Sequence, residues 1–562
     1  MYKLYTYIKV LSIFTLIVIL TNCGGSGNGM NTTIADSSTE TDSSTDEFNR
    51  SEYKGLVFYP KKLSSTSYTL TQLDDATLNA LNKTQKLKVA NKLLSTLFYG
   101  YNLPTLEAKL DAGNFIESIR TGLNEDRTDK EWLENYIVDD EKFSQNNYNE
   151  QVAVNILTRF YAMKELDSYF LNNWVAYILT QTIMFSPAYE LESTHTPNIA
   201  RVYNRLVTML NVDSGMRYIS YVHMMSEDNW RRFRSPEDNG REMMEIFTLD
   251  MDDSHVPLAG QALQNWKLDR ESDTLVVSLN QNRKPLQLFN TTIYNGDDFY
   301  REMAKSDLFT KGVTTRLVNF FFPNTVQSKK TQIVNSILSS HPEAWQDILL
   351  QIVFSEEYLL HTTRAKSAEE LFFSMSKKID FQHRTGTFHE FKNALEKMHQ
   401  ASMKYKLGKL ERVPLDTLSF ANYHKFIRER MLLKKSNSDK MNEYKAYDRQ
   451  GWSKNFIQNT RYTLDETDGI ASLESFIQYI FHATISRDAT QKEMQFFKTH
   501  MLRNESETNT TKVPSYAFNL IQKNQDAHKQ LKGRESHKRD IAIMVLDYIS
   551  RLTEIYTLQK VK

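Results

Sequence analysis

Apolar residues recur at helical spacing along most of this chain, and strand-like alternation is scarce. Only residues 275–288, with a turn at Asn280–Arg283, have the pattern of a strand or hairpin. The hydrophobic pattern therefore predicts a mainly α fold, a large multi-helix orthogonal bundle with at most one small β-hairpin. It predicts several helices within 75–123, one opening at Thr84 and the next at Leu103. The other main helical segments that it predicts are 152–179 with a break near Asp167, 199–210, 218–225, 313–322, 329–338, 345–354, 368–378, 388–405, 473–502, 514–530 and 540–558.

The most informative stretch spans residues 235–266. Ser235 is a good N-cap, and Pro236 suits the first position of a helix. An apolar stripe at helical spacing follows, and it consists of Met243, Met244, Ile246 and Phe247. After an acidic turn at 250–254, a second helical run is expected to end at Trp266.

Charged residues lie on the same predicted helix. Arg241 and Glu245 are four residues apart and Glu242 is beside them, with Trp266 and Arg316 expected nearby in the fold. One interpretation makes Glu242 or Glu245 a general acid or base that Arg241 orients. The other is an ion-pair cluster that locks one helix to another. We favour the second interpretation, and the first stays open.

A basic cluster precedes this helix. Arg231, Arg232 and Arg234 stand just before Ser235. Basic side chains beside a helix N-terminus can form an anion site. The alternative is a solvated loop whose arginines pair with the nearby acidic residues 227 and 228.

The N-terminus has the pattern of a lipoprotein signal peptide, residues 1–22. Lys3 and Lys9 precede an apolar run, residues 10–20, that is too short to span a bilayer comfortably. The sequence Leu-Thr-Asn-Cys then ends at Cys23, the only cysteine in the chain. We expect Cys23 to become a diacylglyceryl cysteine with further acylation, for example by palmitate. The alternative is an ordinary secretory signal with an incidental cysteine.

The following segment, residues 23–50, is rich in Gly, Ser, Thr and Asp and is expected to be a disordered tether. A flexible chain of this length has a root-mean-square reach of about 25–30 Å. Because Gly24 stands where some inner-membrane lipoproteins have Asp, the outer membrane is the expected location, with the body in the periplasm or on the cell surface.

Several segments together resemble a known family. GREMMEIFTLD, residues 240–250, resembles the ARELLELFTLG signature of the bacterial domain-of-unknown-function 1800 family. Further segments follow in that family's order, namely 89–123, 164–174, 251–266, 316–323 and 354–358. The resemblance implies a helical core over residues 51–365, with 366–562 as a helical continuation or C-terminal subdomain.

The resemblance has departures and implications. Leu171 and Asn173 replace two histidines of the family, and Asp238 replaces an asparagine. Further on, Gln261 and Gln264 stand where Arg and Thr are usual.

Because relatives are often encoded beside a sulfatase-like exported protein, the resemblance implies such a protein as a partner.

Charge and motifs narrow the function. Lys+Arg and Asp+Glu both total 69, so no overall field directs the chain to nucleic acid. His389-Glu390 lacks the second histidine of a zinc-protease motif because position 393 is Asn, and we expect no metal and no cofactor.

Whether the chain is an enzyme stays open. The first hypothesis is a cell-envelope lipoprotein that binds or assembles with another exported protein. The alternative is a periplasmic hydrolase of an envelope polymer that uses the glutamates.

Overall fold

The computed structural model describes most of the helical body. The described residues are 68–126, 150–184, 199–230, 233, 235–269, 274–379, 385–397, 417–426, 469–501 and 535–561. The signal peptide, Cys23, the tether, the arginines at 231, 232 and 234, and the predicted helix at 514–530 lie outside these residues.

Helices make up most of the described chain, which confirms the mainly α prediction. The N-terminal part contains α4 (Asp75–Asn79), α5 (Lys83–Thr96), α6 (Leu103–Asp111), α7 (Phe115–Asn124), α9 (Glu150–Ala162), α10 (Ser168–Gln181), α11 (Ile199–Asn211), α12 (Met216–Met224), α13 (Glu227–Trp230), α14 (Pro236–Thr248), η3 (Asp253–His255) and α15 (Val256–Ala262). The remainder contains α16 (Gly296–Lys305), α17 (Asp307–Phe321), α18 (Gln327–Ser339), α19 (Trp345–Val353), η4 (Glu357–His361), α20 (Ala368–Lys378), α21 (Thr385–Lys397), α22 (Thr417–Phe426), α24 (Gly469–Ile485), α25 (Gln491–Met501), α27 (Glu535–Ile549) and α28 (Thr553–Tyr556).

The β structure differs in detail from the single hairpin expected. Three antiparallel pairs occur among the described residues: β1 (Trp266–Asp269) with β2 (Thr274–Val277), β3 (Leu286–Leu288) with β4 (Thr291–Ile293), and β5 (Arg364–Ala365) with β6 (Thr557–Leu558). The two strands expected to pair with each other within 275–288 instead belong to different sheets, β2 and β3.

Local backbone chemistry explains this difference. The helical run expected to reach Trp266 ends with α15, and Trp266 starts β1 and aligns with Val277 of β2. Strand β3 turns directly into β4 through Phe289 and Asn290, whose φ angles are +55° and +60°. Two consecutive residues at positive φ are typical of a type I′ hairpin turn. Asn favours this conformation, whereas Phe does not, and the phenylalanine hid the turn in the sequence.

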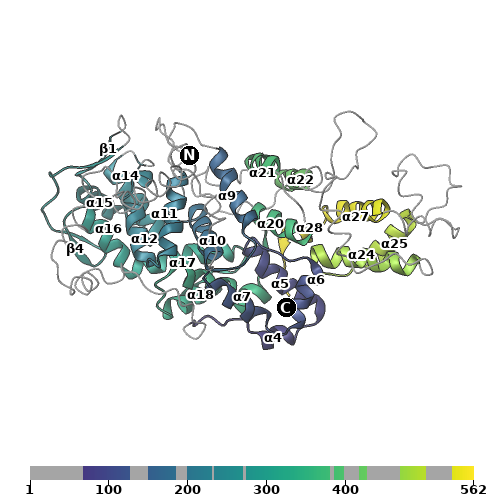
Figure 1. The fold of residues 1–562 in the computed structure, drawn as a ribbon. Helices are drawn as coiled ribbons and strands as arrows, with labels where there is room; N and C mark the ends of the chain where they lie inside the picture. The colour runs from purple at the N-terminus through teal and green to yellow at the C-terminus, as the bar shows by residue number, and fades with distance from the viewer. Residues whose placement is uncertain are drawn as a thin grey trace, which may run out of the picture.

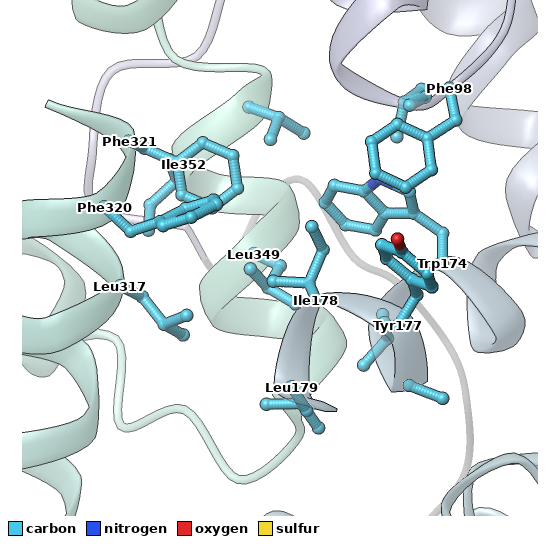
Figure 2. Packing of buried hydrophobic residues seen from close by; sticks show 14 of the residues in the cluster. Phe98, Trp174, Tyr177, Ile178, Leu179, Leu317, Phe320, Phe321, Leu349 and Ile352 are labelled. Atoms are coloured by element: carbon cyan, nitrogen blue, oxygen red, sulfur yellow. The ribbon is translucent and has the colours of Figure 1, made fainter. Parts of the chain in front are cut away.

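Helix α10 lies at the centre of the core. The predicted break before it is confirmed, since the Asp167 side chain caps α10 by accepting from the backbone N–H of Phe170 at 2.7 Å. Figure 2 shows side chains of α10 packed among residues of α17 and α19, with Phe98 beyond the end of α5. The aromatic residues of this region are buried or packed against the core, namely Phe160, Tyr161, Tyr169, Phe170, Trp174 and Tyr177.

Polar tips of this core reach partners on other helices. The Trp174 indole N–H donates to the backbone oxygen of Thr96 at 2.9 Å, and the Tyr177 hydroxyl donates to Glu369 Oε1 at 2.6 Å. A buried aromatic side chain with a polar tip usually requires such a partner. These two bonds connect α10 with α5 and α20.

The C-terminal end of the chain returns to the helical body. Strand β6 pairs with β5, and the backbone N–H of Val561 donates to the oxygen of Leu360 at 2.7 Å. Figure 1 shows the chain end close to α5, although α24, α25 and α27 extend away on one side. Beside β5, the fully buried Arg364 forms a bidentate ion pair with Glu370 of α20.

None of the described helices combines the length and apolar character that a membrane crossing requires.

Helix α14 packs unusually closely against α15 and α17. A Cβ on Gly240 of α14 would lie 2.6 Å from the Cβ of Ala259 in α15. A Cβ on Gly312 of α17 would lie 2.3 Å from the backbone oxygen of Phe247 and 2.8 Å from the Cα of Thr248. Glycine is therefore required at both contacts for steric reasons. α14 is thus fixed between two helices by backbone approach.

The substitution Gly312→Ala tests this contact. The added methyl group would force α17 away from rigid backbone, and overpacking of this kind costs about 1–3 kcal/mol. Thermal unfolding followed by circular dichroism should show a clear drop in Tm. The matched control is Lys311→Ala at the exposed neighbouring position, where a change within about 0.5 kcal/mol is expected. Equal Tm values for the two variants would contradict the close packing.

Candidate functional site

The start of α14 has the structure that its sequence predicts. Ser235 has extended backbone angles and its side chain accepts from the backbone N–H of Asp238 at 3.2 Å, with Pro236 at the first helical position. The predicted apolar stripe is buried, and it consists of Met243, Met244, Ile246 and Phe247. The helix ends at Leu249, which takes the left-handed conformation at φ 57°.

Arg316 of α17 provides the main contact to the end of α14. Its Nε donates to the backbone oxygen of Ile246 at 2.6 Å, and its Nη2 donates to the backbone oxygen of Glu245. The last carbonyl groups of an α-helix have no partner within the helix and carry the negative end of its dipole. A guanidinium group from a neighbouring helix therefore satisfies them and complements their charge.

The two glutamates of α14 lie in the same neighbourhood. Glu242 and Glu245 are both half-buried, and both act electrostatically on Arg316. Burial lowers the pKa of Arg316, whereas the nearby Glu245 and Glu242 raise it. Arg241 is exposed on the helix surface. The structure thus brings Glu242, Glu245 and Arg316 together, and it leaves Arg241 in solvent.

Trp266 belongs to an aromatic cluster at the other half of α14. Its ring stacks on Trp230 at 6.0 Å between centroids and meets the edge of Tyr300 at 5.5 Å. The Tyr300 hydroxyl donates to Asn239 Oδ1 of α14 at 2.7 Å. Trp266 also packs against Gly296, where a Cβ would lie 2.1 Å from the indole nitrogen. Its contacts are those of a buried core residue.

Of the positions that depart from the pattern of the resembled family, Leu171 and Asn173 are buried, whereas Asp238 and Gln261 are half-buried and Gln264 is exposed. Asn173 accepts from Arg159 Nη1 at 3.2 Å and from the Tyr203 hydroxyl at 2.9 Å. Leu171 is buried in the apolar core. Asn173 therefore takes part in a buried polar network, in which an uncompensated member would be costly. The arginines at 231, 232 and 234 lie outside the described residues, so the predicted anion site there stays a prediction.

Within the described part of the chain, no group of three or more His, Cys, Asp and Glu residues is placed to hold a metal ion. No protein-family model, curated protein or solved structure matches the chain.

The structure also contains a cavity that the sequence did not predict. Three lysines from distant segments, Lys92, Lys366 and Lys378, are buried around one cavity. One signal was present in the sequence, because the polar residues Lys88, Asn91, Lys92 and Ser95 recur at spacings of three and four along a predicted helix. Such a stripe normally faces solvent, and only the packing of α20 and α24 against α5 shows that it is enclosed.

The substitution Arg316→Met tests whether the charged cluster of α14 is structural. It removes both hydrogen bonds to the end of α14 and should cost about 1.5–3 kcal/mol of stability, the usual range for hydrogen bonds to a charged group. Denaturant unfolding measures the difference. The comparison variant is Arg241→Met on the same helix, which should change stability by less than about 0.5 kcal/mol because Arg241 is exposed. Unchanged stability of Arg316→Met would contradict a structural role.

Proposed function

We propose that this chain is a lipid-anchored protein of the bacterial cell envelope whose helical body binds another exported protein. In this proposal the chain performs no chemistry at α14. The acylated Cys23 attaches it to the membrane, and residues 23–50 act as a tether. The body then meets its partner in the periplasm or at the cell surface.

The contacts of Arg316 are the main support for the proposal that α14 has a structural role. Its guanidinium group donates to two backbone oxygens of α14, which are groups that any helix end must satisfy. Glu242 and Glu245 both interact electrostatically with it. In addition, the lysine-lined cavity, and a second one beside Arg120 and Phe354, are lined by neither glutamate. These features support a brace between α14 and α17, and they weigh against an acid–base pair open to a polymer substrate.

The N-terminal pattern supports the anchor. A basic start, a short apolar run and a single cysteine directly after it are explained together by lipidation. Each buried CH₂ group of an acyl chain contributes about 0.8 kcal/mol, so two or three chains hold a protein stably at a membrane. An outer-membrane position follows from Gly24 after the cysteine.

The resemblance to the domain-of-unknown-function 1800 family supports the partner. Because genes of this family often stand beside a gene for a sulfatase-like exported protein, such a protein is the specific candidate for the partner. The balanced charge of the chain, 69 basic and 69 acidic residues, favours recognition by shape and local contacts over a long-range field.

Metabolic labelling with an alkyne analogue of palmitate tests the anchor. The full-length protein should take up label, and Cys23→Ser should lose all of it because serine lacks the thiol that is acylated. Ser26→Ala in the tether is the matched control and should keep the label. Mass spectrometry that finds an unmodified Cys23 thiol at the mature N-terminus would rule out the anchor.

Mild crosslinking in cells followed by purification tests the partner. An exported protein should be recovered with the wild-type chain in a defined ratio, and Arg241→Met, which keeps the fold, should recover it as well. If the chain is recovered alone while purified protein hydrolyses an envelope polymer and loses this activity in Glu242→Gln or Glu245→Gln, the enzyme hypothesis replaces the proposal.

A further inference from the structure

A cavity lined by lysines lies where four helices meet. Helices α5, α20, α24 and α28 come together near the middle of the molecule (Figure 1). The cavity between them is lined by Lys88, Asn91, Lys92, Ser95, Lys366, Lys378, Thr484, Ile485, Ser486, Glu554, Thr557, Leu558 and Gln559. Four of these residues are lysines and one is a glutamate, so positive groups dominate the lining.

Helix α5 contributes one polar face to the cavity. Lys88, Asn91, Lys92 and Ser95 follow one another at helical spacing, and the last three are buried. Lys92 donates through Nζ to the backbone oxygen of Thr362 and lies 5.0 Å from the centre of the Tyr358 ring. Lys88 is half-buried and lies closer to solvent.

Two further lysines reach the cavity from segments far along the chain. Lys366 donates through Nζ to the backbone oxygen of Ile555 at 2.9 Å. Lys378, the last residue of α20, donates to the backbone oxygen of Thr484 at 3.2 Å, near the end of α24. An ammonium group has three hydrogens to donate. Each of these lysines therefore keeps donors beyond its contact with a carbonyl group.

The nearby carboxylates are engaged elsewhere. Glu370 forms the bidentate pair with Arg364, and Glu554 at the rim pairs with Arg487 at 3.2 Å. Among the described residues, no ion pair joins Lys88, Lys92, Lys366 or Lys378 to a carboxylate. Removing an ammonium group from water without a counter-charge is costly. An anion bound in the cavity would supply the counter-charge that these lysines lack.

Uncharged polar groups point to the same conclusion. Ser95 is 1% exposed and Asn91 is 6% exposed, and both line the cavity. Among the described residues, Ser95 Oγ has no hydrogen-bond partner, whereas Asn91 Nδ2 donates to Ser486 Oγ at 2.8 Å. A hydroxyl group can donate to an anion. A buried polar group without a partner costs stability, so a ligand or water is expected beside it.

The size of the cavity limits the ligand. Its volume is about 40 Å³. One water molecule requires roughly 10–15 Å³ of such space, so the cavity holds about three waters or one compact oxyanion. Lysine ammonium groups bind phosphate as point charges. Half-exposed residues, including Lys88 and Gln559, form the rim, which leaves a path for a group attached to the ion.

We propose that this cavity binds a phosphate dianion, held by the ammonium groups of Lys92, Lys366 and Lys378 and by the hydroxyl of Ser95. The ion is either free phosphate or the phosphate group of a monoester whose remainder extends past the rim. Its two negative charges offset part of the buried positive charge and occupy the donors that the backbone carbonyls leave open.

The charge state of the lysines gives this site a characteristic pH dependence. Burial lowers the pKa of Lys366 to about 8. The negative charge of Glu370 raises this pKa, and the positive charge of Arg364 lowers it further. Burial also lowers the pKa of Lys92, assisted by Arg364, and that of Lys378, assisted by Lys366. The other charged groups at the cavity are Lys88 and the paired Glu554. A bound dianion favours the protonated lysines, so affinity must fall as the pH rises through about 8.

Isothermal titration calorimetry on the full-length protein in detergent tests the site, with inorganic phosphate and sn-glycerol 3-phosphate as separate probes. Saturable binding to one site is expected, with a Tm that rises with ligand concentration at constant ionic strength. Tighter binding of the ester identifies a carried phosphate group, and equal or tighter binding of inorganic phosphate identifies the free ion. If neither probe binds, the proposal is overturned.

Variants separate specific binding from general attraction. Lys366→Met, Lys378→Met and Ser95→Ala remove proposed ligands and should each weaken binding, the lysine variants by at least about tenfold. Since the lysine variants remove a poorly solvated charge, they should fold with unchanged circular dichroism. Lys560→Met is the matched control, because this exposed lysine follows Gln559 but does not line the cavity. Equal loss of affinity in the control would overturn the assignment.

The pH dependence provides a second readout. Glycerol 3-phosphate is a dianion at both pH 8 and about pH 9.5, since its second pKa is about 6. Its affinity should fall about tenfold between these values as Lys366 loses its proton. The Lys366→Met variant should show a smaller change. Constant affinity of the wild-type protein over this range would contradict binding by protonated Lys366.

Discussion

Close backbone approach of α14 to α15 and α17 is the constraint on which this part of the fold depends. Gly240 and Gly312 let the helices approach to distances at which any side chain would clash. At this separation the Arg316 side chain reaches the last carbonyl groups of α14 and satisfies them. The steric and electrostatic contacts therefore act at the same interface, since Gly312 permits the close approach and Arg316, one turn further along α17, donates to the end of α14.

This arrangement gives a physical reason for charge on a helix that is otherwise apolar. Glu242 and Glu245 lie beside a half-buried guanidinium group that already serves the backbone. The cluster offsets part of the desolvation of Arg316. The lysine cavity has the opposite character, because its positive groups have no carboxylate partners among the described residues. One cluster is therefore balanced within the chain, and the other is the proposed anion site.

Much of the helical body could be predicted from the sequence. The N-cap at Ser235 and the break at Asp167 both follow from local pattern, and the structure contains each of them. Strand pairing was predicted less well, since β5 pairs with β6 almost two hundred residues away, and no local pattern encodes such a partner. The Phe289–Asn290 turn was missed because phenylalanine rarely takes positive φ.

Residues that are neighbours in the fold could be predicted only where the sequence carried a local signature. Glu242, Glu245 and Arg316 were predicted to lie together because a sequence signature drew attention to them. The structure places them in the same neighbourhood. Lys366 and Lys378 gave no such signal, since an isolated lysine in sequence is normally a solvated surface residue. Their burial depends on α24 and α28 packing against α5 and α20, which only the assembled fold reveals.

A double-mutant cycle between Glu245 and Arg316 tests the central claim most directly. Unfolding free energies are measured for the wild type, Glu245→Gln, Arg316→Met and the double variant. If the pair braces α14 against α17, the two substitutions are coupled by about 0.5–1 kcal/mol or more. Strictly additive effects, with Glu245→Gln as stable as the wild type, would contradict the brace and return Glu245 to consideration as a catalytic group.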